Sequence, residues 1–425
     1  MLNLLLKNTF FLMLPLLISC GNNVGGSDNA FAKADSFPQN SKLKIQDSKI
    51  ADSSIIVGAN RIDEYLPLLQ NKKVGIVTNQ SGLIFKSYPH NKENATHIVD
   101  SLIARDIEVI KIFSPEHGFR GDGDAGEKIK DGKDPKTGLP IISLHGKNRK
   151  PSQEQLDGLD IIVFDIQDVG VRFYTYISTL THVMEATAEK GVPVIVLDRP
   201  NPNAHYIDGP TLQKQHSSFL GMHEIPLVYG MTIGEYARMV NGEGWLKDKM
   251  QCELTVIPLE NWSYQSKYSL PTRPSPNLPN DKSINLYPSL GFFEGTTINA
   301  GRGTEMQFQV FGSPHLPKEY YPFTYTPEPN FGSKDPKEKG NLCYGLDLRN
   351  EPYLKRVNLE WLVEAYNASN DKVNFFKTDG FTLHAGTTEL EKQIKEGYTF
   401  REIRKGWFKD IESFKKTRAK YLIYE

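Results

Sequence analysis

The sequence predicts an α/β protein in which a domain built on a parallel β-sheet is followed by a smaller α+β domain. From Ile55 onward, short runs of apolar and β-branched residues alternate with segments of helical spacing, which is the pattern of βαβ units in a parallel sheet. After about Gly209 this alternation stops, and an irregular region follows that is rich in Pro and Gly between Leu270 and Pro336.

Most of the predicted strands are nearly continuous apolar runs, as expected for strands covered on both faces. They span residues 73–78, 108–113, 139–144, 160–165 and 192–198. Between them, residues 96–105 and 175–190 have helical spacing, and Gly191 stands where a helix C-cap is expected.

In the second half of the sequence, two capping boxes predict the starts of helices. Thr232 is followed three residues later by Glu235, and Thr399 by Glu402; each pair can satisfy N–H groups that a helix start leaves without partners.

The N-terminus resembles a bacterial lipoprotein signal. Lys7 is the only charged residue before an apolar stretch that ends at Ser19 and Cys20, within the sequence LISC. Cleavage before Cys20 would leave a cysteine whose two or more acyl chains suffice for stable anchoring. We therefore expect an exported lipoprotein that is held in the membrane through Cys20 and faces the periplasm.

The expected organisation follows from these patterns. The polar tract behind Cys20 is typical of a flexible tether. We expect a signal peptide, a tether, a sheet-based catalytic domain and an α+β domain, at residues 1–19, 20–53, 54–209 and 210–425. Whether Cys252 and Cys343 form a disulfide stays open, because their spacing does not decide it.

The overall charge argues against a nucleic acid partner. Lys and Arg total 50 against 51 for Asp and Glu, a formal net charge of −1. A balance of this kind gives no electrostatic footprint for a polyanion.

Polar and ionisable residues follow all five predicted strands, which is the strongest functional signal in the chain. In open parallel sheets, ligands bind beyond the carboxyl ends of the strands. A sheet needs no carboxylates there for stability, so their convergence predicts a site at this edge. The residues in question are Thr78-Asn79-Gln80, Ser114-Pro115-Glu116-His117, His145-Gly146, Asp165 with Gln167, Asp168 and Arg172, and Asp198-Arg199-Pro200-Asn201.

No cofactor is expected at this edge. Gly121, Gly123 and Gly126 match G-x-G-x-x-G, but they begin several residues past the strand and alternate with acidic residues that would repel a pyrophosphate. The phosphate-binding sequence G-x-x-x-x-G-K-[ST] does not occur in the chain. The segment 121–130 is interpreted as an acidic loop.

A metal centre stays an alternative, although none is expected. N and O ligands could converge at the strand ends, but none of them has the compact spacing of a zinc motif. The candidates are Glu116, His117, His145, Asp165, Asp168 and Asp198.

At these strand ends the sequence resembles the exo-β-N-acetylmuramidase family, glycoside hydrolase family 171. Six segments carry the resemblance in the same order through nearly all of the chain beyond the tether: SPEHGFRG, FDIQDVGVRFYTY, VLDRPNPN, YGMTIGEYA, PSPN and GRGTEMQF. The resemblance implies a Rossmann-like first domain and hydrolytic release of terminal N-acetylmuramic acid from peptidoglycan fragments. It also implies that Glu116 is the glutamate of the family's core motif.

For this chemistry a glycosidase needs a proton donor and a second group that supports the oxocarbenium-like centre or activates water. Glu116 is the expected donor, with His117 beside it as a further catalytic candidate. For the second group Asp168 ranks first, but Asp165, Glu294 and the acetamido oxygen of the substrate stay open.

The remaining candidates are expected to bind the sugar. A bidentate Arg is the natural partner of the lactyl carboxylate of muramic acid, and Arg172 is preferred to Arg199 and Arg302 because it shares a loop with Asp168. Further predicted substrate-binding residues are Asn79, Gln167, Tyr174, Tyr176, Asp198, Asn201, Asn203 and Glu294. Two other functions stay possible on the sequence alone: a metal-dependent hydrolase of another substrate, and a non-catalytic lipoprotein that binds cell-wall sugars.

Overall fold

The computed structural model describes residues 54–120 and 131–425, which fold as one compact unit. Cys20, the expected tether and the acidic loop 121–130 lie outside the described residues.

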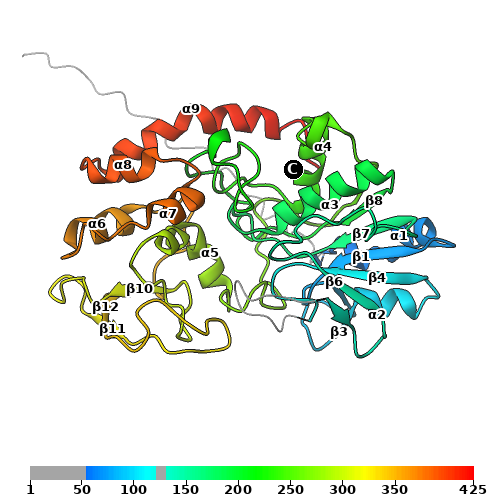
Figure 1. Ribbon diagram of the computed structural model, residues 1–425, viewed down its shortest axis with the longest axis horizontal. Helices are drawn as coiled ribbons and strands as arrows, with labels where there is room; N and C mark the ends of the chain where they lie inside the picture. Colours follow the sequence, from blue (N-terminus) through cyan, green and yellow to red (C-terminus); the bar gives the residue numbers. More distant parts are fainter. Residues whose placement is uncertain (1–53, 121–130) are drawn as a thin grey trace, which may run out of the picture. The chain divides into compact units, whose positions relative to one another are not determined.

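A seven-stranded sheet, whose strands run from Val74 to Ile257, forms the centre of the first part of the chain (Figure 1). Its order is β5-β6-β4-β1-β7-β8-β9, and all neighbouring strands are parallel except the short edge strand β5, which pairs antiparallel with β6. The six parallel strands, numbered along the chain, follow the order 3-2-1-4-5-6 of the Rossmann fold. The bounds are β1 Val74–Thr78, β4 Val109–Ser114, β5 Gly132–Lys133, β6 Pro140–Ser143, β7 Ile161–Asp165, β8 Val194–Leu197 and β9 Leu254–Ile257.

The α/β fold class is confirmed, but the expected domain boundary at Gly209 is wrong. Strand β9 pairs in parallel with β8, so the sheet is completed about 45 residues later than expected. The sequence did not reveal β9 because this edge strand is only partly buried. A long irregular connection also separates it from β8, so the crossover between the two strands has no clear sequence pattern.

Side chains of the central strands alternate between two hydrophobic layers. On β7, Ile162 and Phe164 join the layer beneath α3 (Tyr176–Lys190) and α4 (Ile233–Gly242). Ile161 and Val163 join the opposite layer, beneath α1 (Ile62–Leu69) and α2 (Ile98–Ile103). This period of two on a doubly covered sheet explains why the strands are apolar throughout.

Helix ends form as the sequence predicts. Gly191 ends α3 with a φ of 76°, a conformation that favours glycine. The capping boxes of Thr232 with Glu235 and of Thr399 with Glu402 are both present. A third box, which the sequence analysis missed, joins Asn280 to Ser283 at the start of α5 (Asp281–Leu290).

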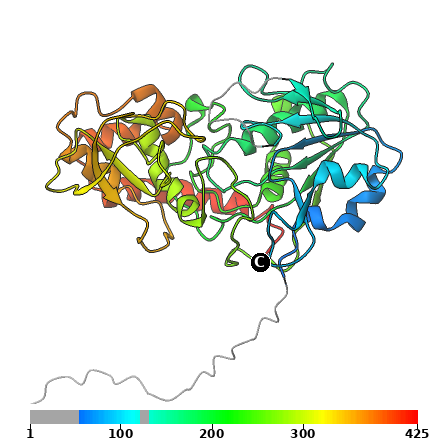
Figure 2. The same ribbon diagram turned by 90° about the horizontal axis from the view of Figure 1, so that it is seen from below.

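The second part of the chain combines helices with a small sheet, and its last helix returns to the first part (Figures 1 and 2). Its strands are β10 Val310–Ser313, β11 Phe323–Tyr325 and β12 Cys343–Asp347, in the antiparallel order β10-β12-β11, and its later helices are α6 Glu360–Ala368, α7 Thr378–Ala385, α8 Glu389–Lys395 and α9 Phe400–Arg418. The smaller elements are the hairpin of β2 Leu83–Phe85 with β3 Ala95–His97 and four short 3₁₀ helices, η1 Gly58–Asn60, η2 Lys214–His216, η3 Lys247–Lys249 and η4 Gly291–Gly295.

The end of α9 and the residues after it form hydrogen bonds with the Rossmann-like part of the chain. Arg418 donates to the carbonyl of Gly230, and the hydroxyl of Tyr424 donates to Asp198 at 2.6 Å. The two parts therefore share one folded body.

Neither Cys252 nor Cys343 forms a disulfide. Cys252 and Cys343 are buried and unpaired, and burial raises the pKa of both thiols.

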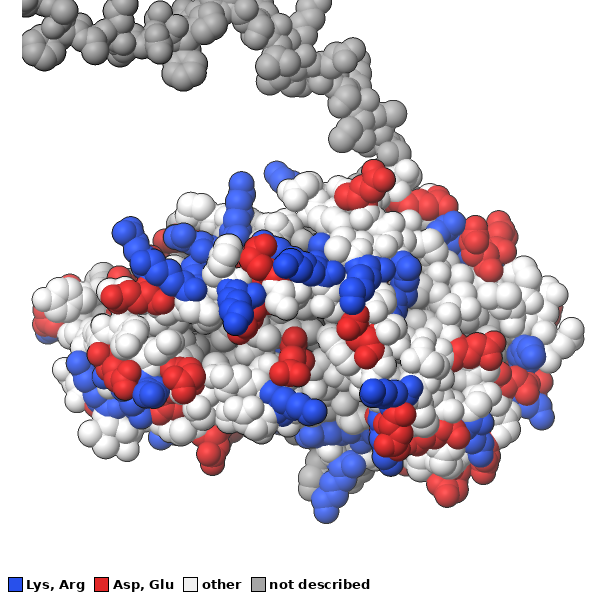
Figure 3. All heavy atoms as spheres, turned by 90° about the horizontal axis from the view of Figure 1, so that it is seen from above, with Lys and Arg blue, Asp and Glu red and all other residues white. Residues whose placement is uncertain are grey.

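Within the described residues, no helix is both long enough and apolar enough to span a membrane. Basic side chains gather in a band on the side that carries α9 (Figure 3), where the outward residues of this helix include Arg401, Lys405, Lys409 and Lys416.

Candidate active site

Glu116 lies in a tight turn at the carboxyl end of β4. The N–H of Gly118 donates to the carbonyl of Pro115 at 3.2 Å, and His117 between them has a φ of 72°. A positive φ at the third position is what such a turn requires, and His tolerates it better than most residues. The hydroxyl of Thr175, just before α3, donates to Glu116 Oε2 at 3.3 Å.

Glu116 faces a cavity of about 70 Å³ whose walls come from five segments of the chain, residues 116–117, 173–176, 275–278, 287 and 302–308. Typical ligand pockets enclose about 300–1,000 Å³, so the enclosed part accepts the end of a ligand and the rest would extend through its mouth. Within the described residues, Glu116 is the single carboxylate of the lining. The lining residues are Glu116, His117, Phe173, Tyr174, Thr175, Tyr176, Ser275, Asn277, Leu278, Tyr287, Arg302 and Phe308.

Aromatic rings form one wall of this cavity. The rings of Tyr174 and Tyr176 meet edge to face at 4.8 Å, and both hydroxyls donate to the carbonyl of Pro274, at 2.8 and 3.3 Å. Tyr287 packs against Phe308 at 4.8 Å. Burial raises the pKa of both Tyr174 and Tyr176, so the two phenols stay neutral donors.

An ion pair between Arg302 and Glu294 stands beside Phe308 of this wall. Arg302 Nε is 3.1 Å from Glu294 Oε1, and its guanidinium lies 5.1 Å from the ring centre of Phe308. Burial disfavours the charged form of Glu294, but the charges of Arg302 and Lys337 outweigh it and lower its pKa to about 2. The charge of Glu116 also acts on Arg302, which brings opposite charges together in one small cavity.

The structure thus brings five of the predicted residues together: Glu116, His117, Tyr174, Tyr176 and Arg302. Glu294 stands behind them as the partner of Arg302.

Asp168 lies outside this lining, contrary to its expected role as the second catalytic group. Its carboxylate is buried, accepts from the backbone N–H of Gly170 at 2.7 Å, and is bonded by the hydroxyl of Tyr229. Burial raises the pKa of Asp168 to about 6, against the effect of the Tyr229 bond. Both bonds go to Oδ2, Oδ1 has no hydrogen-bond partner among the described residues, and the charge of Asp168 acts on Tyr174 and Tyr176 although Asp168 does not itself line the cavity.

Arg172 is likewise placed elsewhere, which corrects its preferred role as the carboxylate reader. Its guanidinium is fully buried and donates to four backbone carbonyls, those of Pro210, Ile225, His384 and Ala385, at 2.7–3.1 Å. Because four oxygens already occupy the fork, Arg172 joins segments of the chain and has no place for a ligand carboxylate.

Asp165 and Arg199 neutralise one another inside the fold. Arg199 Nε and Nη2 are 2.6 and 2.9 Å from the two oxygens of Asp165, and Nη2 also donates to the carbonyl of Leu83. Both side chains are at most 2% exposed. This pair fills the sheet edge beyond β7, where the sequence predicted ligand contacts.

The other polar residues at the strand ends hold loops together. Asp198 accepts from the backbone N–H groups of Arg199 and Gly234 and from the hydroxyls of Thr232 and Tyr424. The amides of Asn79, Gln167, Asn201 and Asn203 likewise bond neighbouring loop residues, and none of the four lines the cavity.

Sequence reasoning missed several residues of the cavity. Ser275 and Asn277 belong to the segment PSPN, which was noted without any role. Tyr287 lies on α5, where it reads as an ordinary core position. In the described part of the chain, no cluster of three or more His, Cys, Asp or Glu is arranged to hold a metal ion.

Comparison with known proteins identifies the family. Residues 74–282 match the N-terminal family model of the exo-β-N-acetylmuramidase NamZ, and residues 285–424 match its C-terminal model. The chain belongs to the NamZ family.

Its relatives match over most of their length. The peptidoglycan β-N-acetylmuramidase NamZ of Bacillus subtilis (strain 168) is 36% identical over 382 residues, which cover 85% of this chain and 89% of that protein. Two crystal structures of DUF1343 family proteins from Bacteroides fragilis NCTC 9343 are also similar. One has a TM-score of 0.80 at 42% identity and covers 88% of this chain and 99% of its own. The other has a TM-score of 0.74 at 29% identity and covers 87% and 99%.

The two NamZ segments meet at the cavity. Glu116, Tyr174 and Tyr176 fall in the N-terminal match, whereas Tyr287 and Arg302 fall in the C-terminal match. The site is therefore built by both parts of the family's chain, and the junction at residues 282–285 replaces the boundary expected at Gly209.

Proposed function

We propose that this protein is an exo-acting glycoside hydrolase that releases N-acetylmuramic acid from the non-reducing ends of peptidoglycan fragments. The observation that carries the proposal is the cavity between the two NamZ segments, in which a carboxylate, Glu116, faces an arginine, Arg302. The activity named for the Bacillus subtilis relative supports it.

Glu116 is the proposed proton donor to the leaving oxygen. It is the single carboxylate of the described lining, and Thr175 holds one of its oxygens at 3.3 Å. A general acid of this kind contributes about 10²–10⁴-fold to the rate.

The second catalytic role is assigned to the substrate itself. Asp165 is paired with Arg199, Asp168 does not line the cavity, and Glu294 is neutralised by Arg302. The 2-acetamido oxygen of muramic acid can support the anomeric centre in their place, as in substrate-assisted glycosidases. This mechanism retains the β configuration, so ¹H NMR of the first product should show the β anomer; the α anomer would instead indicate direct attack by water.

Arg302 is the proposed reader of the lactyl carboxylate. Glu294 binds its Nε at 3.1 Å and so fixes the orientation of the planar fork. A fixed guanidinium gains a charge-assisted bond with muramic acid and loses it with glucosamine.

The decisive experiment is product analysis on a disaccharide with muramic acid at its non-reducing end and N-acetylglucosamine at the other. Free N-acetylmuramic acid should appear, whereas the N-acetylglucosamine dimer should stay uncleaved. Binding without release would indicate a sugar-binding lipoprotein. Activity that is lost on chelation and restored by one divalent ion would indicate a metallohydrolase.

We also propose that the protein is exported and anchored through an acylated Cys20, on the strength of the LISC sequence. Cys20→Ser should move it from the membrane to the soluble or uncleaved fraction. Continued membrane partitioning of a processed variant through an acyl chain would contradict the assignment.

A further inference from the structure

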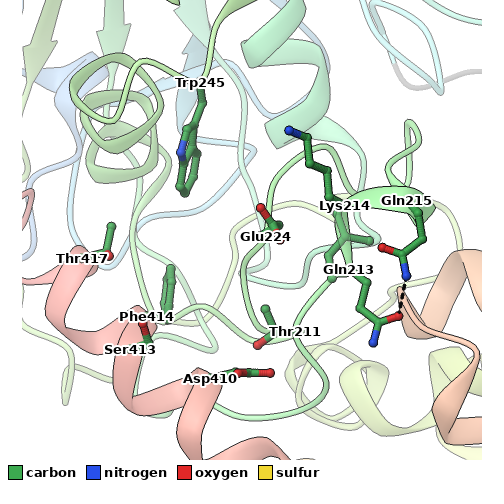
Figure 4. A pocket seen from close by; sticks show the side chains of 11 residues that line it. Thr211, Gln213, Lys214, Gln215, Glu224, Trp245, Asp410, Ser413, Phe414 and Thr417 are labelled. Atoms are coloured by element: carbon green, nitrogen blue, oxygen red, sulfur yellow. Dashed lines mark hydrogen bonds between the residues drawn. The ribbon is translucent and has the colours of Figure 1, made fainter.

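A second and larger pocket lies on the side of the molecule where α9 returns to the first part of the chain (Figure 4). Its volume is about 440 Å³, within the range of about 300–1,000 Å³ that is usual for small-ligand sites. It shares no lining residue with the cavity of Glu116. The lining residues are Thr211, Leu212, Gln213, Lys214, Gln215, Glu224, Trp245, Asp410, Ser413, Phe414 and Thr417.

The walls of this pocket are fixed by the fold. Arg172 bonds the carbonyls of Pro210 and Ile225, which stand directly beside the lining residues Thr211 and Glu224 in the chain. Leu212 N–H also donates to Ile225 at 3.1 Å, and Gln213 N–H donates to Gly386 at 2.8 Å. A pocket held in this way is formed before any ligand arrives, so binding costs little ordering.

One side of the pocket is aromatic. The indole of Trp245 points into it from beyond α4, and the imidazole of His223 stacks on that indole at 4.8 Å. Leu212 and Phe414 are buried and form an apolar floor. These groups offer a flat surface for the C–H face of a ring.

The rest of the lining forms hydrogen bonds. The amides of Gln213 and Gln215 are joined at 3.1 Å and the hydroxyls of Ser413 and Thr417 come from α9.

The charges of the lining select against an anion. Glu224 and Asp410 contribute two carboxylates against the single ammonium group of Lys214. Carboxylates and amides accept and donate to hydroxyl groups, whereas the lining offers a phosphate or a carboxylate ligand only one exposed ammonium group. An uncharged ring with several hydroxyl groups satisfies all parts of the lining.

We infer that this pocket binds an uncharged sugar unit of a glycan chain, as a saccharide site separate from the catalytic cavity. Its biological role rests on the proposed function: the enzyme would hold the polymer at one site while it removes terminal sugars at the other, which raises the local concentration of chain ends. The segment of Arg172 connects the sites, because Phe173 lines the catalytic cavity while the Arg172 guanidinium holds the wall of the second pocket.

The test uses the trimer of N-acetylglucosamine, which contains no muramic acid, and measures its binding by titration calorimetry. Ser413→Tyr places a ring in the pocket from an exposed helix position and should weaken binding by about tenfold or more. Lys405→Tyr adds the same ring about two turns away on the outward side of α9, so it is the control and should bind as the wild type does. A double Gln213→Ala and Gln215→Ala variant checks the result without adding bulk.

Further outcomes separate this inference from the proposed function. Glu116→Gln should keep trimer binding although it stops turnover. No binding to the wild type, unchanged binding to Ser413→Tyr, or loss of binding in Arg302→Lys to the same extent would overturn the second site. Preferential binding of a charged wall peptide would overturn the sugar assignment. If the trimer binds and no muramic acid is released from the disaccharide, the proposed function fails and the saccharide site stands.

Discussion

Two groups of polar residues lie near the same edge of the sheet, and one is buried in the fold whereas the other lines a cavity. Beyond β7 and β8, Asp165 and Arg199 neutralise each other while Asp198 receives four hydrogen bonds. Around the cavity beyond β4, Glu116 and Arg302 face the same small space from different parts of the chain. A buried charge whose partners all come from the fold holds the fold together, whereas a charged group that lines a cavity can also contact a ligand.

The largest expected effect is that of Glu116→Gln. The amide is nearly isosteric but has no proton to donate, so kcat should fall by about 10²–10⁴-fold. Turnover on a muramic-acid-terminated disaccharide measures the loss, and an unchanged melting temperature shows that the fold is kept. Near wild-type turnover in a folded variant would remove Glu116 from the chemistry.

Arg302→Lys tests the ligand-facing arginine. Lysine keeps the charge but lacks the planar fork, so discrimination between muramic acid and glucosamine at the cleaved position should weaken by about 2–4 kcal/mol. The measurement is kcat/KM for both sugars in both proteins. An equal loss on both sugars would make Arg302 a structural residue.

Arg172→Lys is the matched change in the other group. Lysine cannot reach all four carbonyls that Arg172 bonds, so the free energy of unfolding should fall by about 2–3 kcal/mol. The preference for muramic acid should stay as in the wild type. Urea denaturation measures the stability, and kcat/KM for the two sugars measures the preference. A changed preference at unchanged stability would make Arg172 a substrate-reading residue and not a structural one.

Asp198 gives a smaller effect that depends on pH. Burial, with a contribution from the charge of Glu235, raises its pKa from 3.8 to about 7, against the hydrogen bonds of Tyr424 and Thr232. Between these values the folded state holds a proton that the unfolded state has lost, so this stabilisation is complete below about pH 4 and is lost as pH rises to 7.

The slope from Asp198 is at most about 1.4 kcal/mol per pH unit. Asp198→Asn does not titrate, so its destabilisation relative to wild type should be larger at pH 5 than at pH 7 in urea denaturation. A difference independent of pH would show that Asp198 has an ordinary pKa in the fold.

The sequence by itself determined five of the seven strands of the large sheet, two of its helices and the place of Glu116. Five strands, two helices and two capping boxes form where the residue patterns predict them, because burial on both faces and helix capping act over short stretches of chain. The position of Glu116 after β4 followed from the same rule, since parallel strands present their carboxyl ends at one edge.

Only the tertiary structure decided which polar residues serve the site. Arg172, Asp168 and Arg302 are equally polar in the sequence, yet Arg172 meets carbonyls more than 200 residues away at His384 and Ala385, while Arg302 reaches the cavity from the second part of the chain. The total charge of the chain is balanced, so the composition does not reveal the basic band over α9. Whether a buried polar group is satisfied depends on partners brought by long-range packing, and no local pattern of residues contains them.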